Sequence, residues 1–490
     1  MHIGEFTGKK EKTIEYLVKS LSIGKDTFTE GYISLENIYK AVEILSGFGN
    51  KLDEYGLRKN YRALCTSGVR EASNGYFFID HVRINTGIEL EILEPSDEIY
   101  IKYLGVKNAI PKIDDYEKNG LLFTNISSGN VFINILKKER LILSQSLPYG
   151  SIRLTQIFKD IPVQKRHKAY EQDIGKMVRT LKNLLPKKTN LIKYMVSSGS
   201  SIATILDVIN PQKDIITKKE LISTYNRIKE MGTDEIMNNF KLRQSQIEIL
   251  VPTLITYLKI MDFAGTGFFH FTRNSFPHSM FLYYSKKIKD PRLYNRFKNT
   301  LYYIGEKYSF DENHAKTVAK FALKLFSKLK KIHSLKWKDR QLLESAAILH
   351  DTGYIIDAKH HEKHSYNIAK SIEFPGYSKE FIEMMAIISS LHKEKYDINN
   401  NYEVPSNLPI EKRLIIYKLT SILRIADALD ASHEQLITDF DIKIESNNIY
   451  IKTNAKKYPY LEYFSFNKKS KIFTRIFGAK ITLEINSNFK

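Results

Sequence analysis

Two histidines and two aspartates, far apart along the chain, are of the types that together bind a divalent metal ion. His350 and Asp351 are adjacent, His314 lies upstream, and Asp427 follows the apolar residues of the segment 423–426. Imidazole nitrogen and carboxylate oxygen suit an octahedral Mn, Fe, Co or Mg ion that keeps open positions. Such an ion can hold a phosphate oxygen and a water of lowered pKa, as metal-assisted phosphoester hydrolysis requires. The set therefore predicts a phosphohydrolase centre, with Asp351 among its catalytic residues.

Three of these residues fall where a folded chain would bring them inward. His350 and Asp351 end a helical pattern, and Asp427 sits in an apolar helix where an unpaired carboxylate is costly to bury. His364 and His392 are further candidates, for a second metal ion or for the phosphate. They could equally be ordinary surface or core histidines, and the sequence leaves both readings open.

Long amphipathic helices are predicted to carry this set. From about residue 290 the apolar residues recur at helical spacing, clearly so over 315–329 and 339–349. We interpret 290–435 as an all-α domain. Beyond it, 436–490 alternates in the manner of strands and contains a basic stretch, which predicts a small α+β tail.

The first part of the chain has the pattern of an α/β protein. Ser34 is positioned to cap a helix over 34–55, short strands are predicted at 61–65 and 89–93, and a helix at 96–106. A second unit opens with a strand at 121–126, a hairpin at 131–144 and a strand at 191–196. We expect two lobes, 1–118 and 119–285, with small-residue loops at a cleft between them.

Composition narrows the class of protein. A chain of 490 residues is too long for a single hydrophobic core, so several domains are expected. A hydrophobic fraction of 42% argues against disorder. Cys65 is the only cysteine, so neither a disulfide framework nor a thiolate zinc site is expected. No signal peptide and no membrane-spanning run is recognised, which favours a cytoplasmic protein.

The net charge of +20 favours anionic partners, although a lysine-rich composition alone explains it equally well. Basic clusters at 165–168 and 186–188 invite a nucleic-acid reading. No aromatic platform accompanies them in the sequence, so nucleic acid is a weak alternative.

Several segments resemble one known family. LLESAAILHDTGYIIDAKHHEKHS (342–365) and LRIADALD (423–430) look like the HD-type domain of the exopolyphosphatase and guanosine pentaphosphate phosphohydrolase (Ppx/GppA) family. ALCTSGVREASN (63–74) is similar to its A-T-S-x-x-R-E-A-x-N segment, and SDEIYIKYLGV (96–106) to its acidic helix. LPYGSIRL (147–154) is similar to a strand of the family, and FTRIFGAKITLEI (473–485) to its C-terminal element.

The resemblance implies two actin-like, sugar-kinase-like ATPase lobes before the all-α HD-type domain and the α+β tail. It implies phosphate binding by Thr66, Ser67 and Arg70 in the first lobe. The loop residues Ser128 and Gly129 would contribute from the second lobe. It further implies a catalytic acidic pair, Asp97 and Glu98, with Mg neutralising the phosphate chain.

This sequence departs from the family pattern inside that cleft. Met1–Phe6 is similar to the segment just after the family's first phosphate loop, so that loop is not seen in the sequence. Asn125 stands in place of an aspartate, Ser127 and Ser128 in place of glycines, Phe132 in place of an acid and Ile99 in place of an alanine. Together these changes predict weak or lost phosphate transfer in the N-terminal cleft.

The leading hypothesis is therefore a phosphohydrolase acting on polyphosphate or a guanosine polyphosphate, with the HD metal site the better preserved centre. The alternative is a non-catalytic protein that senses phosphate or nucleotide through Arg70. The metal, the substrate and the formation of a homodimer stay open, and no membrane partner is expected.

Overall fold

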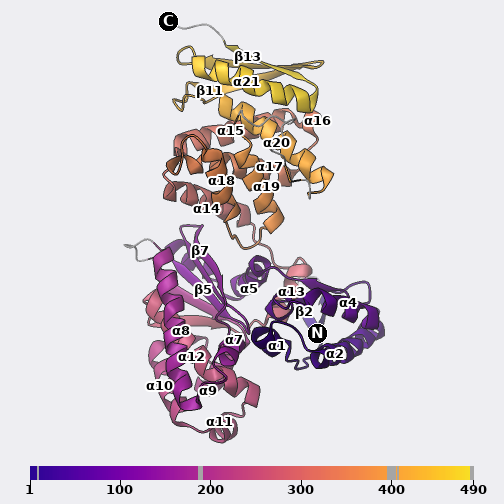
Figure 1. Ribbon diagram of the computed structural model, residues 1–490, viewed down its shortest axis with the longest axis vertical. Helices are drawn as coiled ribbons and strands as arrows, with labels where there is room; N and C mark the ends of the chain where they lie inside the picture. The colour runs from indigo at the N-terminus through magenta and orange to yellow at the C-terminus, as the bar shows by residue number, and fades with distance from the viewer. Residues whose placement is uncertain (8–9, 186–190, 394–403, 406–407, 486–490) are drawn as a thin grey trace. The chain divides into compact units, whose positions relative to one another are not determined.

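The computed structural model describes residues 1–7, 10–185, 191–393, 404–405 and 408–485, so the basic cluster 186–188 lies outside the described residues (Figure 1). The chain divides into two compact units. The N-terminal unit comprises Met1–Pro291 with Phe374–Gly376, and the C-terminal unit comprises Arg292–Glu373 with Tyr377–Lys490. We describe each by itself.

Strands in the N-terminal unit form three sheets. The largest has the order β7-β6-β5-β8-β10-β9; β5, β8 and β10 run parallel, and the outer strands pair antiparallel. A parallel pair β3-β4 and an antiparallel hairpin β1-β2 complete the set. The strands are β1 (His2–Thr7), β2 (Lys10–Tyr16), β3 (Ala63–Cys65), β4 (Leu90–Ile92), β5 (Leu121–Ile126), β6 (Val131–Lys137), β7 (Arg140–Leu147), β8 (Tyr194–Ser198), β9 (Ile215–Thr217) and β10 (Phe268–Thr272).

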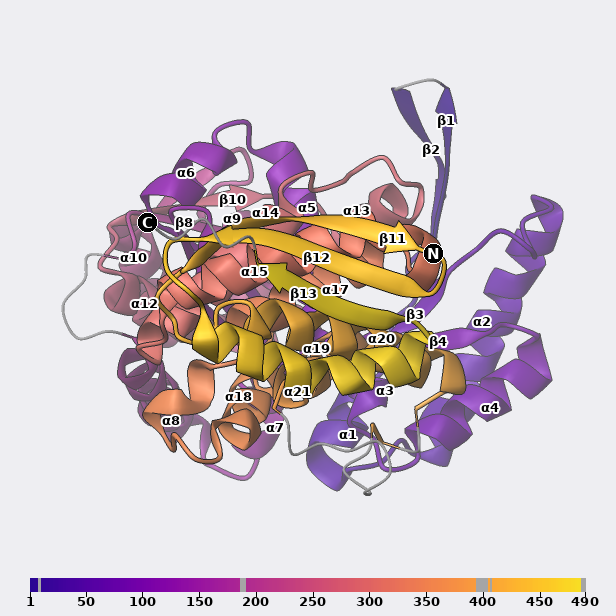
Figure 2. The same cartoon turned by 90° about the horizontal axis from the view of Figure 1, so that it is seen from above.

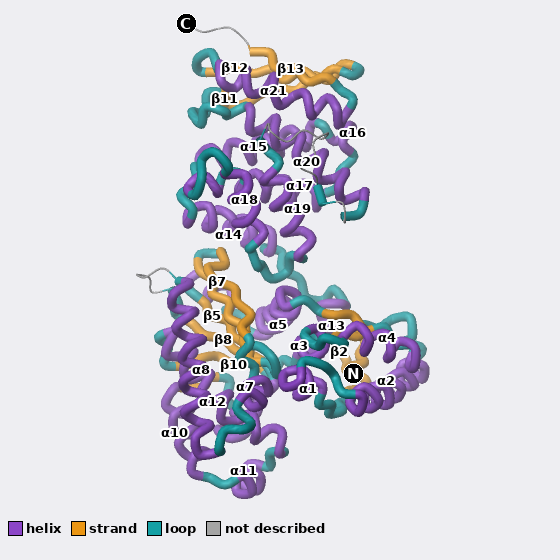
Figure 3. The backbone as a smooth tube through the Cα atoms, viewed as in Figure 1, coloured by secondary structure: helices purple, strands orange, loops and turns teal. Residues whose placement is uncertain are grey.

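Helices cover these sheets, and α8 and α12 run side by side in the second half of the unit (Figures 1 and 3). Every residue of β5 is buried, as expected for a central strand with both faces covered. The helices are α1 (Ile23–Glu30), α2 (Leu35–Glu54), α3 (Ser67–Arg70), α4 (Gly75–Thr86), α5 (Pro95–Ala109), α6 (Ile113–Asn119), α7 (Ser151–Ile157), α8 (Val163–Leu184), α9 (Ser200–Ile209), α10 (Lys218–Glu230), α11 (Thr233–Phe240), α12 (Gln244–Ala264) and α13 (Phe276–Tyr284).

Local sequence signals explain most of these boundaries. The Ser34 side chain accepts a hydrogen bond from the Asn37 N–H and caps α2, as predicted. The strand expected over 147–154 is wrong: β7 ends at Leu147, and residues from Ser151 onward form α7. Pro148 cannot donate a ladder hydrogen bond. Gly150 then packs against the β5–β6 loop, where a Cβ would lie 2.2 Å from the Gly129 carbonyl carbon.

The C-terminal unit is a helical bundle followed by a small sheet. Its helices are α14 (Leu293–Lys307), α15 (Glu312–Lys328), α16 (Lys330–His333), α17 (Trp337–Leu349), the 3₁₀ turn η1 (Thr352–Ile355), α18 (His361–Lys370), α19 (Lys379–Ser390), α20 (Ile410–Ala428) and α21 (Tyr460–Phe477). Its strands are β11 (Ile437–Glu445), β12 (Asn448–Ala455) and β13 (Lys480–Ile485), in the order β11-β12-β13. Figure 2 shows α21 lying along these three strands.

The core of this bundle is built by α15, α17, α19 and α20. The predicted apolar face of α15, which includes Val318, Phe321 and Leu325, is fully buried. The apolar side chains at the end of α17, from Leu343 to Leu349, are buried as well. Phe321 meets Phe440 of β11 edge-to-face at 5.3 Å between ring centroids, which joins the bundle to the sheet. The ends of these helices carry the residues with metal-ligand chemistry.

Among the described residues, no helix is both long enough and apolar enough to cross a membrane.

Candidate metal centre

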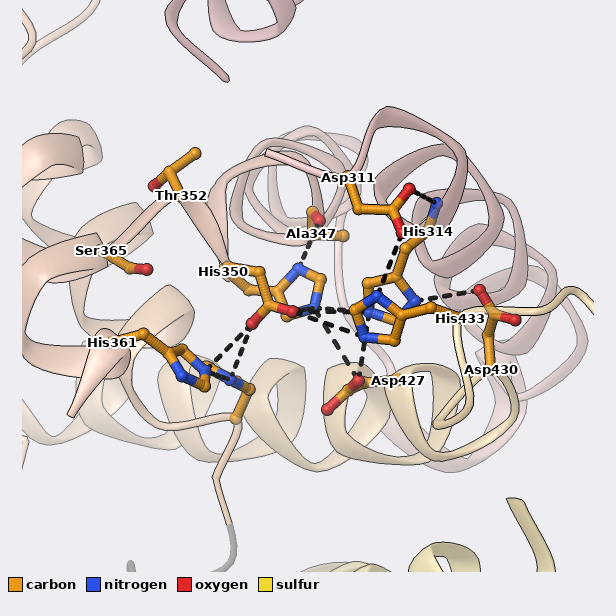
Figure 4. A network of polar contacts seen from close by, with 12 residues as sticks. Asp311, His314, Ala347, His350, Thr352, His361, Ser365, Asp427, Asp430 and His433 are labelled. Atoms are coloured by element: carbon orange, nitrogen blue, oxygen red, sulfur yellow. Dashed lines mark hydrogen bonds and ion pairs between the residues drawn. The ribbon is translucent and has the colours of Figure 1, made fainter. Parts of the chain in front are cut away.

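The four residues singled out from the sequence all lie in the C-terminal unit, and Figure 4 shows His314, His350 and Asp427 pointing toward one another. His314 lies in the first turn of α15, His350 directly after α17, Asp351 before η1 and Asp427 near the end of α20. The His314 Nε2 lies 3.2 Å from the His350 Nε2 and 3.5 Å from an Asp427 oxygen. One oxygen of Asp351 lies 3.7 Å from the His314 Nε2 and 3.6 Å from the His350 Nε2. Ligand atoms of His314, His350 and Asp427 thus lie together as one candidate metal group, and Asp351 approaches both of its imidazoles.

A second group adjoins the first and shares Asp351. The other oxygen of Asp351 lies 3.1 Å from the His361 Nε2 and 3.3 Å from the His392 Nε2, and these two nitrogens are 3.0 Å apart. His361 begins α18 and His392 follows α19. Each oxygen of Asp351 therefore faces a separate pair of imidazoles.

The histidine protons point away from the centre. The Nδ1 atoms of His350, His361 and His392 lie 2.6–3.1 Å from the backbone carbonyl oxygens of Ala347, Ala358 and Ser389. Each Nδ1 must carry the proton to make this bond, so each Nε2 keeps its lone pair. His314 similarly donates through Nδ1 to Asp430 at 2.9 Å. Such outer bonds are typical of metal-ligating histidines.

The facing Nε2 atoms test whether a cation fits. Between His361 and His392 two lone pairs directed at each other at 3.0 Å repel, and neither Nε2 has a proton to offer the other in these tautomers. Positive charge between them removes the conflict. The donor set of imidazole nitrogens and carboxylate oxygens fits a divalent ion of the Mn, Fe or Co type.

The charges in the centre point the same way. Burial by itself lowers the pKa of His314, but hydrogen bonds to Asp427 and Asp430 outweigh it and raise that pKa to about 10. Burial raises the pKa of Asp351 and Asp427, yet the surrounding histidines, and Lys469 for Asp427, hold both well below the usual range. The carboxylates thus demand nearby positive charge, which a proton or a metal ion can supply.

Helix ends and one glycine fix this geometry. Asp311 caps α15 by accepting the His314 N–H at 3.0 Å. A Cβ on Gly353 would lie 2.2 Å from the His361 carbonyl oxygen, and the Gly353 N–H donates to Ser365 at 2.9 Å. Only glycine lets η1 approach α18 this closely, and α18 carries His361.

Three participants carry no clear signal in the sequence. His361 takes the position expected for His364, which lies three residues further along α18 and belongs to none of the ligand groups found among the described residues. His433 stacks on the His314 ring at 3.6 Å between centroids and is a peripheral candidate ligand. Lys469 of α21 pairs with the Asp427 oxygen that faces away from His314.

The residues expected to bind phosphate in the N-terminal unit are also placed. Thr66 precedes α3, Ser67 is buried within it, and Arg70 donates to the Leu93 carbonyl. Ser128 and Gly129 lie between β5 and β6, and their carbonyl oxygens accept N–H groups at the start of α7. A Cβ on Gly129 would lie 2.5 Å from the Ser67 Oγ, so the two loops touch.

The expected acidic pair lies at the start of α5. Glu98 is buried, and its carboxylate is 2.6 Å from the Lys102 ammonium and 3.6 Å from an Arg70 nitrogen. Asp97 is half-buried, and this burial together with the nearby Glu94 raises the pKa of its carboxyl. Asn125, in place of an acid, accepts a hydrogen bond from Lys102 at 2.9 Å.

Individual relatives are distant. A guanosine-5'-triphosphate,3'-diphosphate pyrophosphatase of Pseudoalteromonas translucida is 23% identical over 408 residues, 80% of this chain and 77% of that protein. Exopolyphosphatase 1 of Mycobacterium tuberculosis is 26% identical over 155 residues, 31% of this chain and 44% of that protein. The crystal structure of an exopolyphosphatase from Cytophaga hutchinsonii aligns with a TM-score of 0.51 at 17% identity, covering 59% of this chain and 94% of that one. That likeness supports the expected fold of the lobes.

Family models account for most of the chain. The model of the Ppx/GppA phosphatase family matches residues 7–266, and that of Ppx/GppA phosphatase domain III matches residues 298–464. The first match alone covers more than half of the 490 residues. The chain therefore belongs to the Ppx/GppA phosphatase family.

Proposed function

We propose that this protein is a metal-dependent phosphohydrolase whose working centre lies in the C-terminal, HD-type unit. Its substrate is a phosphoanhydride or phosphoester of the polyphosphate or guanosine polyphosphate class. The observation that carries the proposal is the Asp351 carboxylate, each oxygen of which faces its own pair of histidine Nε2 atoms. The names of the two relatives above support the substrate class.

The residues divide into two ligand sets. His314, His350 and Asp427 would hold one ion together with the Asp351 oxygen that faces both imidazoles, and Asp351, His361 and His392 would hold a second. When bound, the ions supply Lewis acidity and a water of lowered pKa. The protein's own contribution is to orient each Nε2 inward through outer hydrogen bonds and to keep both aspartates ionised by surrounding them with positive groups.

A cationic group stands next to the centre. Lys469 binds the outer oxygen of Asp427 and leaves the inner one directed at His314 and His350. With its outer oxygen paired in this way, Asp427 would serve as a metal ligand through its inner oxygen alone. His433, which is partly exposed, lies 3.9 Å from an oxygen of Asp351 through its Nε2.

The test begins with metal content. We expect purified protein loaded with Mn²⁺ to hold two ions per chain and to release phosphate from polyphosphate or guanosine pentaphosphate. Asp351→Asn should lose both ions and activity, whereas His361→Gln should lose one ion. His364→Gln is the matched control on the same helix and should keep both ions, because His364 is in no ligand group.

Unchanged phosphate release in Asp351→Asn would remove this centre from the reaction. The alternative function, a non-catalytic sensor of phosphate or nucleotide, is favoured by the ion pair that occupies Glu98 in the N-terminal unit. Absence of stoichiometric metal, together with retained binding of a guanosine nucleotide, would support the sensor over the enzyme.

A further inference from the structure

A buried lysine lies between two oxygen ligands in the N-terminal unit. The Lys102 Nζ is 2.6 Å from an oxygen of Glu98 and 2.9 Å from the Asn125 Oδ1. Glu98 is 3% exposed and Lys102 8% exposed, so this is an interior contact and not a helix-surface pair. Glu98 and Lys102 are one turn apart on α5, while Asn125 comes from β5.

The amide of Asn125 is oriented for this contact. Its Nδ2 donates to the Ser198 carbonyl oxygen at 2.6 Å, which fixes the Oδ1 toward Lys102. The ring of Phe132 lies 4.8 Å from the Lys102 Nζ and that of Phe276 lies 5.1 Å from it. Aromatic faces attract a cation, so four groups from separate elements converge on one positive charge.

Oxygen ligands converging on one buried point are what a hard divalent cation requires. Here the ammonium already fills that point. A divalent ion entering the same space would meet the positive charge of the ammonium and only one carboxylate, because the second oxygen belongs to a neutral amide. The remaining Glu98 oxygen makes no hydrogen bond among the described residues and faces Arg70 at 3.6 Å, which adds a further cation.

We propose that Lys102 is the resident cation of the N-terminal unit and that it occupies a Glu98–Asn125 oxygen site which would otherwise take a divalent metal ion. The charge of Lys102 then compensates the carboxylate of Glu98, and no metal ion binds at the Glu98–Asn125 site. This inference does not depend on the centre in the C-terminal unit.

The experiment converts the site into a metal site. In Lys102→Met/Asn125→Asp the cation is gone and two carboxylates face each other, so equilibrium dialysis with Mn²⁺ should count one more ion per chain than in the parent. The matched control is Lys102→Arg/Asn125→Asp, which keeps the positive charge and should count the same as the parent. Circular dichroism establishes that both variants are folded.

A folded Lys102→Met/Asn125→Asp protein that gains no ion would overturn the proposal, and so would an equal gain in the arginine control.

The parent protein provides a second measurement that needs no variant. Acetylation by an N-hydroxysuccinimide ester should label Lys102 at least about tenfold more slowly than exposed Lys112, as a buried paired ammonium requires. That protection should be the same with Mn²⁺ as with EDTA. Labelling that rises when Mn²⁺ is added would show the metal displacing the lysine and contradict the assignment.

Discussion

At the scale of the residue, one carboxylate and one glycine determine most of the candidate centre. Asp351 connects the two ligand groups. Because His350 and Asp351 are adjacent in the chain, one turn supplies a ligand to both groups. The proton positions follow from backbone carbonyls, which hold each imidazole in the tautomer that turns its Nε2 inward. A His-Asp pair alone would say little; the outer hydrogen bonds make the arrangement specific.

Gly353→Ala tests this scale. The added Cβ would overlap the His361 carbonyl oxygen and the Ser365 N–H, so α18 must move away from η1. We expect a loss of about 1–3 kcal/mol in the free energy of unfolding, as for other overpacked sites. The ion held by His361 and His392 should bind more weakly, which metal titration measures. Gly267→Ala, where a Cβ meets nothing within 4 Å, should change neither quantity.

At the scale of the element, His333 at the end of α16 ties together α15, the turn that follows α16, and α20. Its Nε2 donates to the Phe326 carbonyl oxygen at 2.7 Å, its Nδ1 accepts the Leu335 N–H at 2.9 Å, and Lys418 donates to its carbonyl at 3.0 Å. The ring is fully buried and must be neutral to accept the Leu335 N–H. Burial accordingly lowers its pKa below the usual 6.5.

This arrangement predicts acid sensitivity of the C-terminal unit. Because the folded-state pKa of His333 is below that of the unfolded chain, the unfolded state takes up the proton first as the pH falls. The stabilisation is complete above about pH 6.5 and declines below it, by at most about 1.4 kcal/mol per pH unit. Urea unfolding at pH 7.5 and pH 5.5 measures the decline. His333→Gln, which cannot titrate, should be less stable at pH 7.5 but lose less on acidification; an equal loss would contradict this role.

At the scale of the whole molecule, the chain has two units with separate cores. Phe321 is fully buried in the C-terminal unit and Phe123 in the N-terminal unit. Replacing either by alanine should cost about 3–5 kcal/mol, and only in its own unit. We expect calorimetry to resolve two transitions, with Phe321→Ala lowering the melting temperature of one and Phe123→Ala that of the other. A single transition shifted equally by both variants would show that the units unfold together.

The division of labour between the units also belongs to this scale. The N-terminal unit carries a charge-compensated acidic residue, and the C-terminal unit carries the convergent ligand set. If chemistry resides in the C-terminal unit, the variants at Lys102 and Asn125 should leave metal binding by that unit unchanged. Metal binding in the two units can therefore be measured independently.

The sequence by itself determined the elements and the residue types. Helical periodicity and capping residues act over three or four positions, so α2, α15 and α17 could be placed within a few residues. His314, His350, Asp351 and Asp427 could be nominated because their chemistry is distinctive. The family likeness was equally readable, since the motifs are contiguous segments of the chain.

Only the tertiary structure decided which of these groups meet. Neighbouring histidines on α18 differ in the direction they face, so the choice of His361 over His364 depends on how α18 packs on η1. Glu98 and Lys102 stand at an ordinary helix-pair spacing, but their burial beside Asn125 comes from the packing of α5 against the sheet. Contacts between residues distant in sequence are fixed by packing of whole elements, which short-range patterns do not encode.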